Sequence, residues 1–319
     1  MGEDRQAMAK ATSGKPSPLE PLKRFLSRFG IGSTPFKGKP RFAGYYLLDH
    51  LGQGGFGNVY KAVKVKEAHQ ERFVALKKLH EALGEVERRR FRREIDILVS
   101  LSHPNVVEIL ERGEQDRVLF FTMELLEGCT LKQLIKEKRL ELSTVVTMVR
   151  QLASGLHCAH EKGLVHRDIK PSNIFVRQDG RIKIIDFGVA TDPQGTIKLT
   201  LQNRLPGTRL YMPPEVLLAF KKGADDFEAT PAYDQFALGA LVFEMLTQER
   251  PFVHDLNKPD YSHDFSSIIF KKLRSVGDFG VEKAELLDPV LHRAMAGEPK
   301  ERFGSVLAFA EALEKAVES

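Results

Sequence analysis

Cysteine is scarce in this chain: its 319 residues include two, Cys129 and Cys158. They lie far apart and in no spacing that is typical of metal ligands, so neither a disulfide framework nor a zinc site is predicted. We interpret both as reduced structural thiols. The fold must then rest on its hydrophobic core, and a hydrophobic content of 42% is enough for one.

Long apolar runs are also lacking. The longest, at 236–246, is shorter than the span of about 20 residues that a transmembrane helix needs, and Glu244 interrupts it. It is therefore predicted to be a buried core helix. The first residues, MGED, are acidic and unlike the start of a secretory signal. We expect a cytoplasmic localisation.

An excess of one charge is confined to one end of the chain. The formal net charge is +5, yet residues 1–44 carry nine Lys or Arg and three acidic residues, a net of +6, which leaves about −1 for the rest. The basic character therefore belongs to the N-terminal extension. No nucleic-acid partner is expected for the remainder of the chain.

The N-terminal extension, residues 1–44, divides into three predicted parts. Residues 1–18 are polar and end in Pro-Ser-Pro, which indicates a disordered arm. Residues 19–30 are predicted to form a short amphipathic helix, in which Pro21 suits the first turn. The apolar stripe of this helix would pack on the folded domain, bind a partner protein or bind an anionic membrane surface. Residues 31–41 have the composition of a linker.

From residue 45 onwards the pattern changes to short strands and then to helices. Five segments rich in aromatic and β-branched residues are predicted to be strands: 45–51, 58–65, 73–79, 106–111 and 118–124. A charged helix is predicted at 85–101, and after Gly128 the pattern is mainly helical, with a long amphipathic helix at 143–162. The predicted class is α+β, a small antiparallel sheet with one helix followed by a larger helical half.

Two sequence fragments carry the chemistry: HRDIKPSN at 166–173 and DFG at 186–188. Asp168 offers a carboxylate that can accept a hydroxyl proton, and Lys170 offers a cation that can neutralise a migrating phosphoryl group. Asn173 and Asp186 offer oxygen ligands for Mg2+, with Mn2+ as an alternative. Together the fragments predict the transfer of a phosphoryl group from a nucleotide to a hydroxyl.

These fragments resemble those of the protein kinases, and the resemblance covers roughly residues 45–316. It implies a two-lobed protein kinase fold: a small antiparallel β-sheet lobe with one key helix at 45–123, a hinge at 124–128 and a larger, mainly helical lobe at 129–316. It also implies ATP and Mg2+ as cofactors and proteins as substrates.

A glycine-rich segment agrees with this resemblance. Residues 51–59 match G-x-G-x-x-G-x-V, in which missing side chains let backbone amides close over phosphates. A Rossmann site is the alternative, but it needs a helix after the glycines, and 58–65 is predicted to be a strand. The resemblance assigns the phosphate contact to Gly52, Gly54 and Gly57.

The sequence VALK at 74–77 resembles the kinase strand whose lysine grips the α- and β-phosphates. This resemblance assigns that role to Lys77. Kinases pair this lysine with a glutamate of the following helix when they are active. Glu94 is the predicted partner, and Glu85 and Glu87 are the alternatives.

The resemblance also places the rest of the nucleotide pocket. It implies that the gatekeeper is Met123, and that the backbone carbonyl of Glu124 and the amide of Leu126 meet the adenine. Apolar side chains would enclose the base, in a pocket with few directed polar groups. Besides the three glycines, the implied nucleotide-binding residues are Leu51, Val59, Ala75, Lys77, Met123, Glu124, Leu126 and Phe175.

Two features resemble the serine/threonine branch of the family: Lys170 and the sequence GTRLYMPPE at 207–215. The resemblance implies that Thr208 hydrogen-bonds within the catalytic loop and shapes the acceptor site. The final PPE differs from the usual A-P-E by one small residue. Residues 156–165 are similar to those of bacterial eukaryotic-like serine/threonine kinases.

Two structural anchors and one departure complete the resemblance. Arg302 is the expected buried partner of Glu215, and a buried pair of this kind is costly to break. Asp234 is the expected anchor of the catalytic loop. The stretch 215–234 is a few residues longer than is usual for the family, and we interpret it as a surface insertion or as a substrate-specific element.

Regulation is predicted from Arg167, which stands beside Asp168. The resemblance implies that such an arginine pairs with a phosphate of the activation segment. Thr200, then Thr196, is the predicted site of autophosphorylation, since a phosphate there could also pair with Arg90.

Three classes of function are compatible with these motifs. An active serine/threonine protein kinase is favoured because each catalytic position carries the residue that the chemistry needs. A pseudokinase scaffold would lack Lys77, Asp168 or Asp186, and none of them is missing. A kinase of small molecules or lipids is disfavoured by Lys170, Thr208 and the PPE segment at 213–215.

Overall fold

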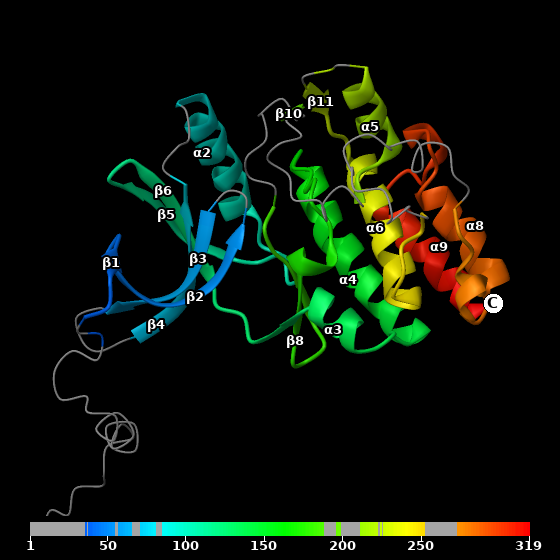
Figure 1. Cartoon of the computed structure of the whole chain (residues 1–319), viewed down its shortest axis with the longest axis horizontal. Helices are drawn as coiled ribbons and strands as arrows, with labels where there is room; N and C mark the ends of the chain where they lie inside the picture. Colours follow the sequence, from blue (N-terminus) through cyan, green and yellow to red (C-terminus); the bar gives the residue numbers. More distant parts are fainter. Residues whose placement is uncertain are drawn as a thin grey trace, which may run out of the picture.

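A computed structural model gives the fold of the chain. It describes residues 36, 38–54, 57–65, 71–80, 85–187, 196–198, 211–222, 224, 226–252 and 273–319. The helix predicted at 19–30 lies outside these residues. The described part has two lobes, a β-sheet lobe with helix α2 and a mainly helical lobe that ends at the C-terminus (Figure 1). The predicted two-lobed fold is confirmed.

The smaller lobe is built on a six-stranded antiparallel sheet in the order β1-β2-β3-β4-β6-β5. Its strands are β1 (Arg41–Phe42), β2 (Tyr45–Gly54), β3 (Gly57–Val65), β4 (Glu71–Leu79), β5 (Ile109–Gln115) and β6 (Val118–Glu124). The strand predicted at 106–111 is wrong in its bounds. Val106 instead makes an isolated parallel bridge to Ile184 of the larger lobe, because the loop before β5 is buried against that strand.

Helix α2 (Glu85–Ser100) covers one face of this sheet. Phe91, Ile95 and Leu98 recur on one side of the helix and are buried in the main core. The Phe91 ring lies 6.0 Å from that of Phe121 in β6. The opposite side is charged and exposed, at Arg89, Arg93 and Asp96. Arg88 lies on the same side as the stripe, is buried, and donates to Glu114 of β5 at 2.5 Å. The helix is thus fixed to the sheet by an apolar stripe and by ion pairs at its edge.

The other face of the sheet carries a second, smaller core. Phe42 of β1 meets Phe120 edge-on, with ring centroids 5.4 Å apart. This cluster consists of Phe42, Tyr45, Ala62, Val74, Leu76, Val118 and Phe120. The short β1 strand, which the sequence did not predict, therefore covers an apolar patch that the sheet would otherwise expose.

The larger lobe is organised around helix α6 (Pro231–Thr247), which is buried without a break from Tyr233 to Thr247. A helix that is apolar all round belongs in a core, and the buried helix predicted at 236–246 is confirmed. The surrounding helices are α3 (Leu131–Glu137), α4 (Leu142–Glu161), α5 (Pro214–Lys221), α8 (Ala284–Ala294) and α9 (Val306–Glu318). Among the described residues no helix combines the length and apolarity needed to cross a membrane.

A three-stranded sheet lies where the lobes meet. Its order is β7-β8-β9, formed by Gly128–Thr130, Ile174–Arg177 and Ile182–Ile184. Gly128 has φ 145°, and a Cβ there would lie 2.1 Å from the Val176 carbonyl oxygen. Only glycine allows this close approach. The strand after the hinge can therefore pack directly onto the strand that follows the catalytic loop.

A further two-stranded ribbon lies on the larger lobe. Strand β10 (Thr196–Lys198) pairs antiparallel with β11 (Asp226–Glu228), which belongs to the stretch 215–234 that the sequence resemblance to the family predicts to be extended. Phe227 of β11 is half-buried and packs against the main core. The stretch therefore has a defined partner, the segment between β9 and α5.

Candidate active site

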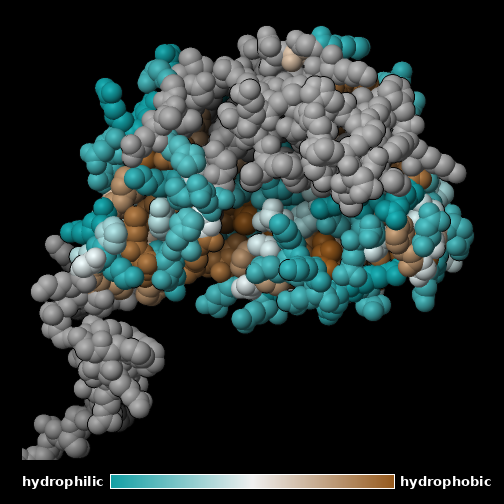
Figure 2. Space-filling view, viewed as in Figure 1, coloured by the Kyte–Doolittle hydropathy of each residue, from teal (hydrophilic) through white to brown (hydrophobic). Residues whose placement is uncertain are grey.

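A cleft of about 470 Å³ opens between the two lobes. Figure 2 shows apolar side chains gathered in the hollow between them. The cleft is lined by eight of the predicted nucleotide-binding residues: Leu51, Gly52, Val59, Ala75, Met123, Glu124, Leu126 and Phe175. The predicted catalytic and metal-binding residues Lys77, Asp168, Lys170, Asn173 and Asp186 line it too. Most residues of the two predicted sets thus meet in a single cleft.

Two glycines of the predicted phosphate-binding segment do not line the cleft. Gly54 ends β2, and Gly57 begins β3 and pairs with it. A Cβ at Gly57 would lie 2.2 Å from the Lys78 carbonyl oxygen, so this glycine is required for the approach of β3 to β4. Its role in phosphate binding stays a prediction.

The sequence missed several residues of the cleft wall. They are Gln53, Val107, Leu125, Thr130, Ser172, Ile185 and Phe187. Leu125, Ser172 and Phe187 stand next to predicted site residues, so proximity in the motifs was an available signal. Val107 and Ile185 are brought in by the contact between the loop before β5 and strand β9, where the Val107 amide donates to the Ile184 carbonyl at 3.0 Å. No local pattern indicates that contact.

Lys77 meets Asp186 across the cleft. Its ammonium lies 2.6 Å from the Asp186 carboxylate, and the lysine side chain is 7% exposed. Burial alone would raise the pKa of Asp186, but the charge and hydrogen bond of Lys77 hold it below its usual value. Lys77 is therefore placed at the same end of the cleft as a predicted metal ligand.

The predicted pairing of Lys77 with Glu94 stays a prediction. Helix α2 contains position 94, but the Glu94 side chain lies outside the described residues, as do those of Glu87 and Arg90. Glu85 is exposed, and its carboxylate lies 3.8 Å from Arg88 on the same helix.

The catalytic loop is held together by its own side chains. Lys170 Nζ lies 2.8 Å from Asp168 Oδ2. Asn173 Nδ2 donates to the Asp168 carbonyl at 2.8 Å and to its Oδ2 at 2.9 Å. The short 3-10 turn η1 (Pro171–Asn173) brings these groups to one side. The Asp168 carboxylate, the Lys170 ammonium and the Asn173 amide thus lie together in the cleft.

The donor set fits a divalent cation. Asn173 uses its amide nitrogen on Asp168, which leaves its amide oxygen available as a ligand. The Asp186 carboxylate offers further hard oxygen atoms in the same cleft. Such ions are often held by one or two protein oxygens together with the phosphates of a nucleotide.

Asp234, in the first turn of α6, anchors the catalytic loop. Its carboxylate accepts the backbone N–H groups of His166 and Arg167, each at 2.8 Å, and lies 2.7 Å from His160 Nε2. The Asp234 side chain is completely buried at the start of α6. Arg167 and Asp186 both have positive φ, 65° and 55°, so the backbone on either side of the site is strained. The anchor keeps the loop in this strained shape.

Replacing Asp234 with asparagine is expected to destabilise the protein most at neutral pH. Burial would raise the pKa of Asp234, but the hydrogen bond and charge of His160 hold it below the usual 3.8. A carboxyl group with a lowered folded-state pKa stabilises above its unfolded pKa, and this contribution is lost as the pH falls through the folded value. The difference in unfolding free energy between parent and variant should narrow as the pH drops below about 3.8.

Urea denaturation of both proteins at several pH values measures this difference. The exposed Asp179, replaced by asparagine, is the control, and its effect should be small throughout. A difference for Asp234 that widens on acidification would contradict the anchor role.

Glu215 and Arg302 form the predicted pair. Two guanidinium nitrogens of Arg302 donate to the two carboxylate oxygens at 2.8 and 2.6 Å. The same guanidinium donates to the carbonyls of Ala296 and Ala232, both at 2.9 Å. The arginine side chain is fully buried. The pair therefore fixes the start of α5 to the far end of the lobe.

The predicted regulatory residues are only partly described. Arg167 is buried, and Thr196 is the first residue of β10. Thr200 and Thr208 lie outside the described residues. Cys129 and Cys158 are half-buried free thiols, which agrees with the prediction that they form no disulfide.

Comparison with known proteins gives consistent results. The family model described as "Protein kinase domain" matches residues 45–313. The serine/threonine-protein kinase PknF of Mycobacterium tuberculosis is 35% identical over 282 residues, which is 85% of this chain and 56% of PknF. PrkC of Bacillus subtilis, a serine/threonine-protein kinase, is 38% identical over 65% of this chain and 31% of its own length.

A solved structure gives the same result. The crystal structure of the Mycobacterium tuberculosis PknI kinase domain aligns with a TM-score of 0.63 and 29% identity, over 87% of this chain and 97% of that domain. The chain spans about half or less of the length of the curated relatives named above.

Proposed function

Because this chain belongs to the protein kinase family, we propose that it is an ATP-dependent serine/threonine kinase, which transfers the γ-phosphoryl group of ATP to hydroxyls of protein substrates. One observation carries the proposal: Asp168, Lys170, Asn173 and Asp186 line the same cleft as the apolar side chains predicted to enclose the adenine. The serine/threonine-protein kinases among its relatives support the choice of acceptor.

Each side chain has a role in this proposal. Asp168 orients the acceptor hydroxyl and takes its proton, and Lys170 stabilises the charge that develops on the transferred group. Lys77 binds the α- and β-phosphates. Asn173 and Asp186 would hold Mg2+, which would neutralise phosphate charge. Asp234 is a positioning residue, since it acts through the backbone of the loop.

Incubation with labelled ATP and Mg2+ tests the proposal. An acidic and a basic generic protein serve as acceptors, and acid hydrolysis identifies the labelled residue. We expect phosphoserine or phosphothreonine, and we expect Lys77→Met to abolish the label. ATP binding without transfer would indicate a scaffold, and transfer to a small molecule alone would indicate a different kinase class.

We propose that the activation segment, between Asp186 and Glu215, is autophosphorylated at Thr200 or Thr196.

A phosphate on Thr196 would act on the β10–β11 ribbon. In this ribbon Thr196 stands opposite Glu228, and Lys198 stands opposite Asp226. A phosphate on Thr196 would place like charges at neighbouring positions, which weakens a strand pair. Phosphorylation at this site is therefore expected to loosen the β10–β11 ribbon. Phosphopeptide mapping of an active preparation tests the sites.

The effect on the ribbon is tested with Thr196→Glu and its uncharged match, Thr196→Gln. Cross-strand charge effects are about 0.2–1 kcal/mol, so the glutamate variant should be cut roughly 1.5- to 5-fold faster in limited proteolysis of this segment. Equal rates for the two variants would show that charge at position 196 does not act on the ribbon.

A further inference from the structure

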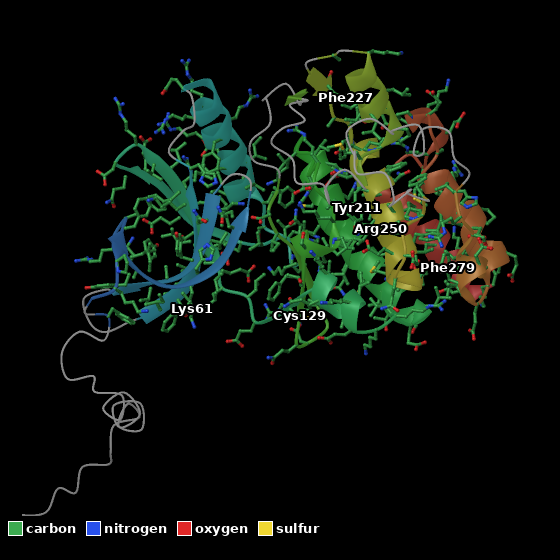
Figure 3. All side chains as sticks on the ribbon, in the orientation of Figure 1. Lys61, Cys129, Tyr211, Phe227, Arg250 and Phe279 are labelled. Atoms are coloured by element: carbon green, nitrogen blue, oxygen red, sulfur yellow. The ribbon has the colours of Figure 1, made fainter. Side chains whose placement is uncertain are left out.

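A side-chain cluster on the larger lobe is not used by the mechanism above. The Tyr211 hydroxyl donates to Oε2 of Glu244, a residue of α6. Arg250 Nη1 lies 2.7 Å from the same oxygen, and its guanidinium stands over the Tyr211 ring, 4.9 Å from the centroid. Figure 3 shows Tyr211 and Arg250 next to each other on the helical lobe. Arg250 thus contacts both the Glu244 carboxylate and the Tyr211 ring.

The charges of two cations, Arg250 and Lys132, act on the Glu244 carboxylate. Its side chain is 12% exposed. Burial raises its pKa, while the charges of Arg250 and Lys132 and the Tyr211 hydrogen bond favour the ionised form. Arg274 donates to the Arg250 carbonyl at 3.2 Å and lies 3.4 Å from Glu249. Lys132, Arg250 and Arg274 against Glu244 and Glu249 give this patch a net charge of +1.

The cluster lies within reach of a bound peptide. Asp234 holds the backbone just before Asp168, and Glu244 follows Asp234 by ten residues in the same helix. At 1.5 Å per residue this places Glu244 about 15 Å along α6 from the catalytic loop. An extended peptide covers that distance in about four or five residues, and long side chains shorten it. A substrate residue two to five positions from the acceptor can therefore meet the patch.

Arg250 also remains partly open to solvent. Its side chain is 34% exposed, whereas the carboxylate that it binds is almost covered. A peptide that passes the cluster therefore meets guanidinium rather than carboxylate. A guanidinium attracts acidic side chains of a peptide and repels basic ones, and such differences discriminate between peptides.

Resting on the proposed kinase activity, we propose that Arg250 is a specificity-determining residue. By binding Glu244 it withholds this carboxylate from basic side chains of the substrate, and its exposed part favours acidic ones. The chain therefore selects serine or threonine with aspartate or glutamate two to five positions away, and it discriminates against lysine and arginine there.

Matched peptides test this selection. One series carries glutamate and the other lysine at each position from −5 to +5 around a single threonine, and kcat/KM is measured for each. The ratio for glutamate over lysine does not depend on the fraction of active enzyme. We expect the parent to favour glutamate by about 10-fold or more at one or more of the positions two to five residues away, and Arg250→Gln to bring the ratio to about 1 or below.

Two further variants keep the test decisive. Glu244→Gln frees Arg250, so its ratio should equal or exceed that of the parent, even if Arg250→Gln does not fold. Arg139→Gln is the control, because Arg139 is an exposed arginine bound to the Phe279 carbonyl at 2.8 Å, and its ratio should match the parent's.

A parent that favours lysine, or a ratio that Arg250→Gln leaves unchanged, overturns the inference while kinase activity stands. Absence of transfer to every peptide and protein overturns the kinase activity itself.

Discussion

Replacing Asp168 with asparagine is expected to lower kcat for phosphoryl transfer by about 10²- to 10⁴-fold, the usual contribution of a positioned general base. Asparagine has the same shape, and its side-chain oxygen can still accept the hydrogen bond from Asn173 Nδ2, now at 2.9 Å. It cannot take a proton from the acceptor hydroxyl. The loss should therefore appear in kcat, and the KM for ATP should change little.

The control for this variant is Asp179→Asn. Asp179 is an exposed acid near the turn between β8 and β9, where Arg177 and Arg181 lie 3.6 and 3.7 Å away. Its replacement should leave kcat within about 2-fold, because exposed ion pairs contribute little. A parent-like kcat for Asp168→Asn would mean that another group takes the proton, or that the measured transfer comes from a contaminating kinase.

Replacing Arg302 with methionine is expected to lower the free energy of unfolding by about 3 kcal/mol, toward the lower end of the range for breaking a buried ion pair. The variant leaves the Glu215 carboxylate with 17% of its side chain exposed and without its two guanidinium donors. It also removes the donors of two backbone carbonyls. The lower end applies because some water can reach Glu215. Urea denaturation measures the change.

A double variant separates lost pairing from lost packing. Arg302→Met with Glu215→Gln carries no unpaired buried charge, so it should regain part of the stability that Arg302→Met loses. Arg181→Met is the surface control, since Arg181 is 72% exposed and pairs with Asp179 at 3.7 Å. Its effect should stay below about 1 kcal/mol. A single variant as stable as the parent would show that the pair does not hold α5.

The sequence predicted best what depends on neighbouring residues. The catalytic loop is an example, because Asp168, Lys170 and Asn173 lie within six positions and their contacts follow from one short turn. The α6 core helix is another, since an apolar run that only Glu244 interrupts has few alternatives to burial. The strand at β5 was misplaced because Val106 and Val107 are apolar for a reason outside the sheet, their contact with β9.

Contacts between distant residues were predicted only where the family resemblance implied them, as for Glu215 and Arg302. Lys77 and Asp186 are 109 positions apart, and the motifs that contain them say nothing about their separation in space. The Arg250 cluster brings Tyr211, which precedes α5, into contact with Glu244 near the end of α6 and with Arg250 just after that helix. Similarly, the partner of Thr196 in β11 lies 32 positions further along. Each of these contacts is decided by tertiary packing rather than by local preference.

The uninterrupted burial of α6 predicts how the protein opens under native conditions. The amides of its central turns are hydrogen-bonded within the helix and shielded on every side. They can reach deuterated solvent only when the whole lobe opens, so their hydrogen exchange should report global unfolding. The amides of β1 pair with a single strand at the edge of the sheet. They should exchange through a local opening, so deuterium uptake would rank the two cores of this protein in stability.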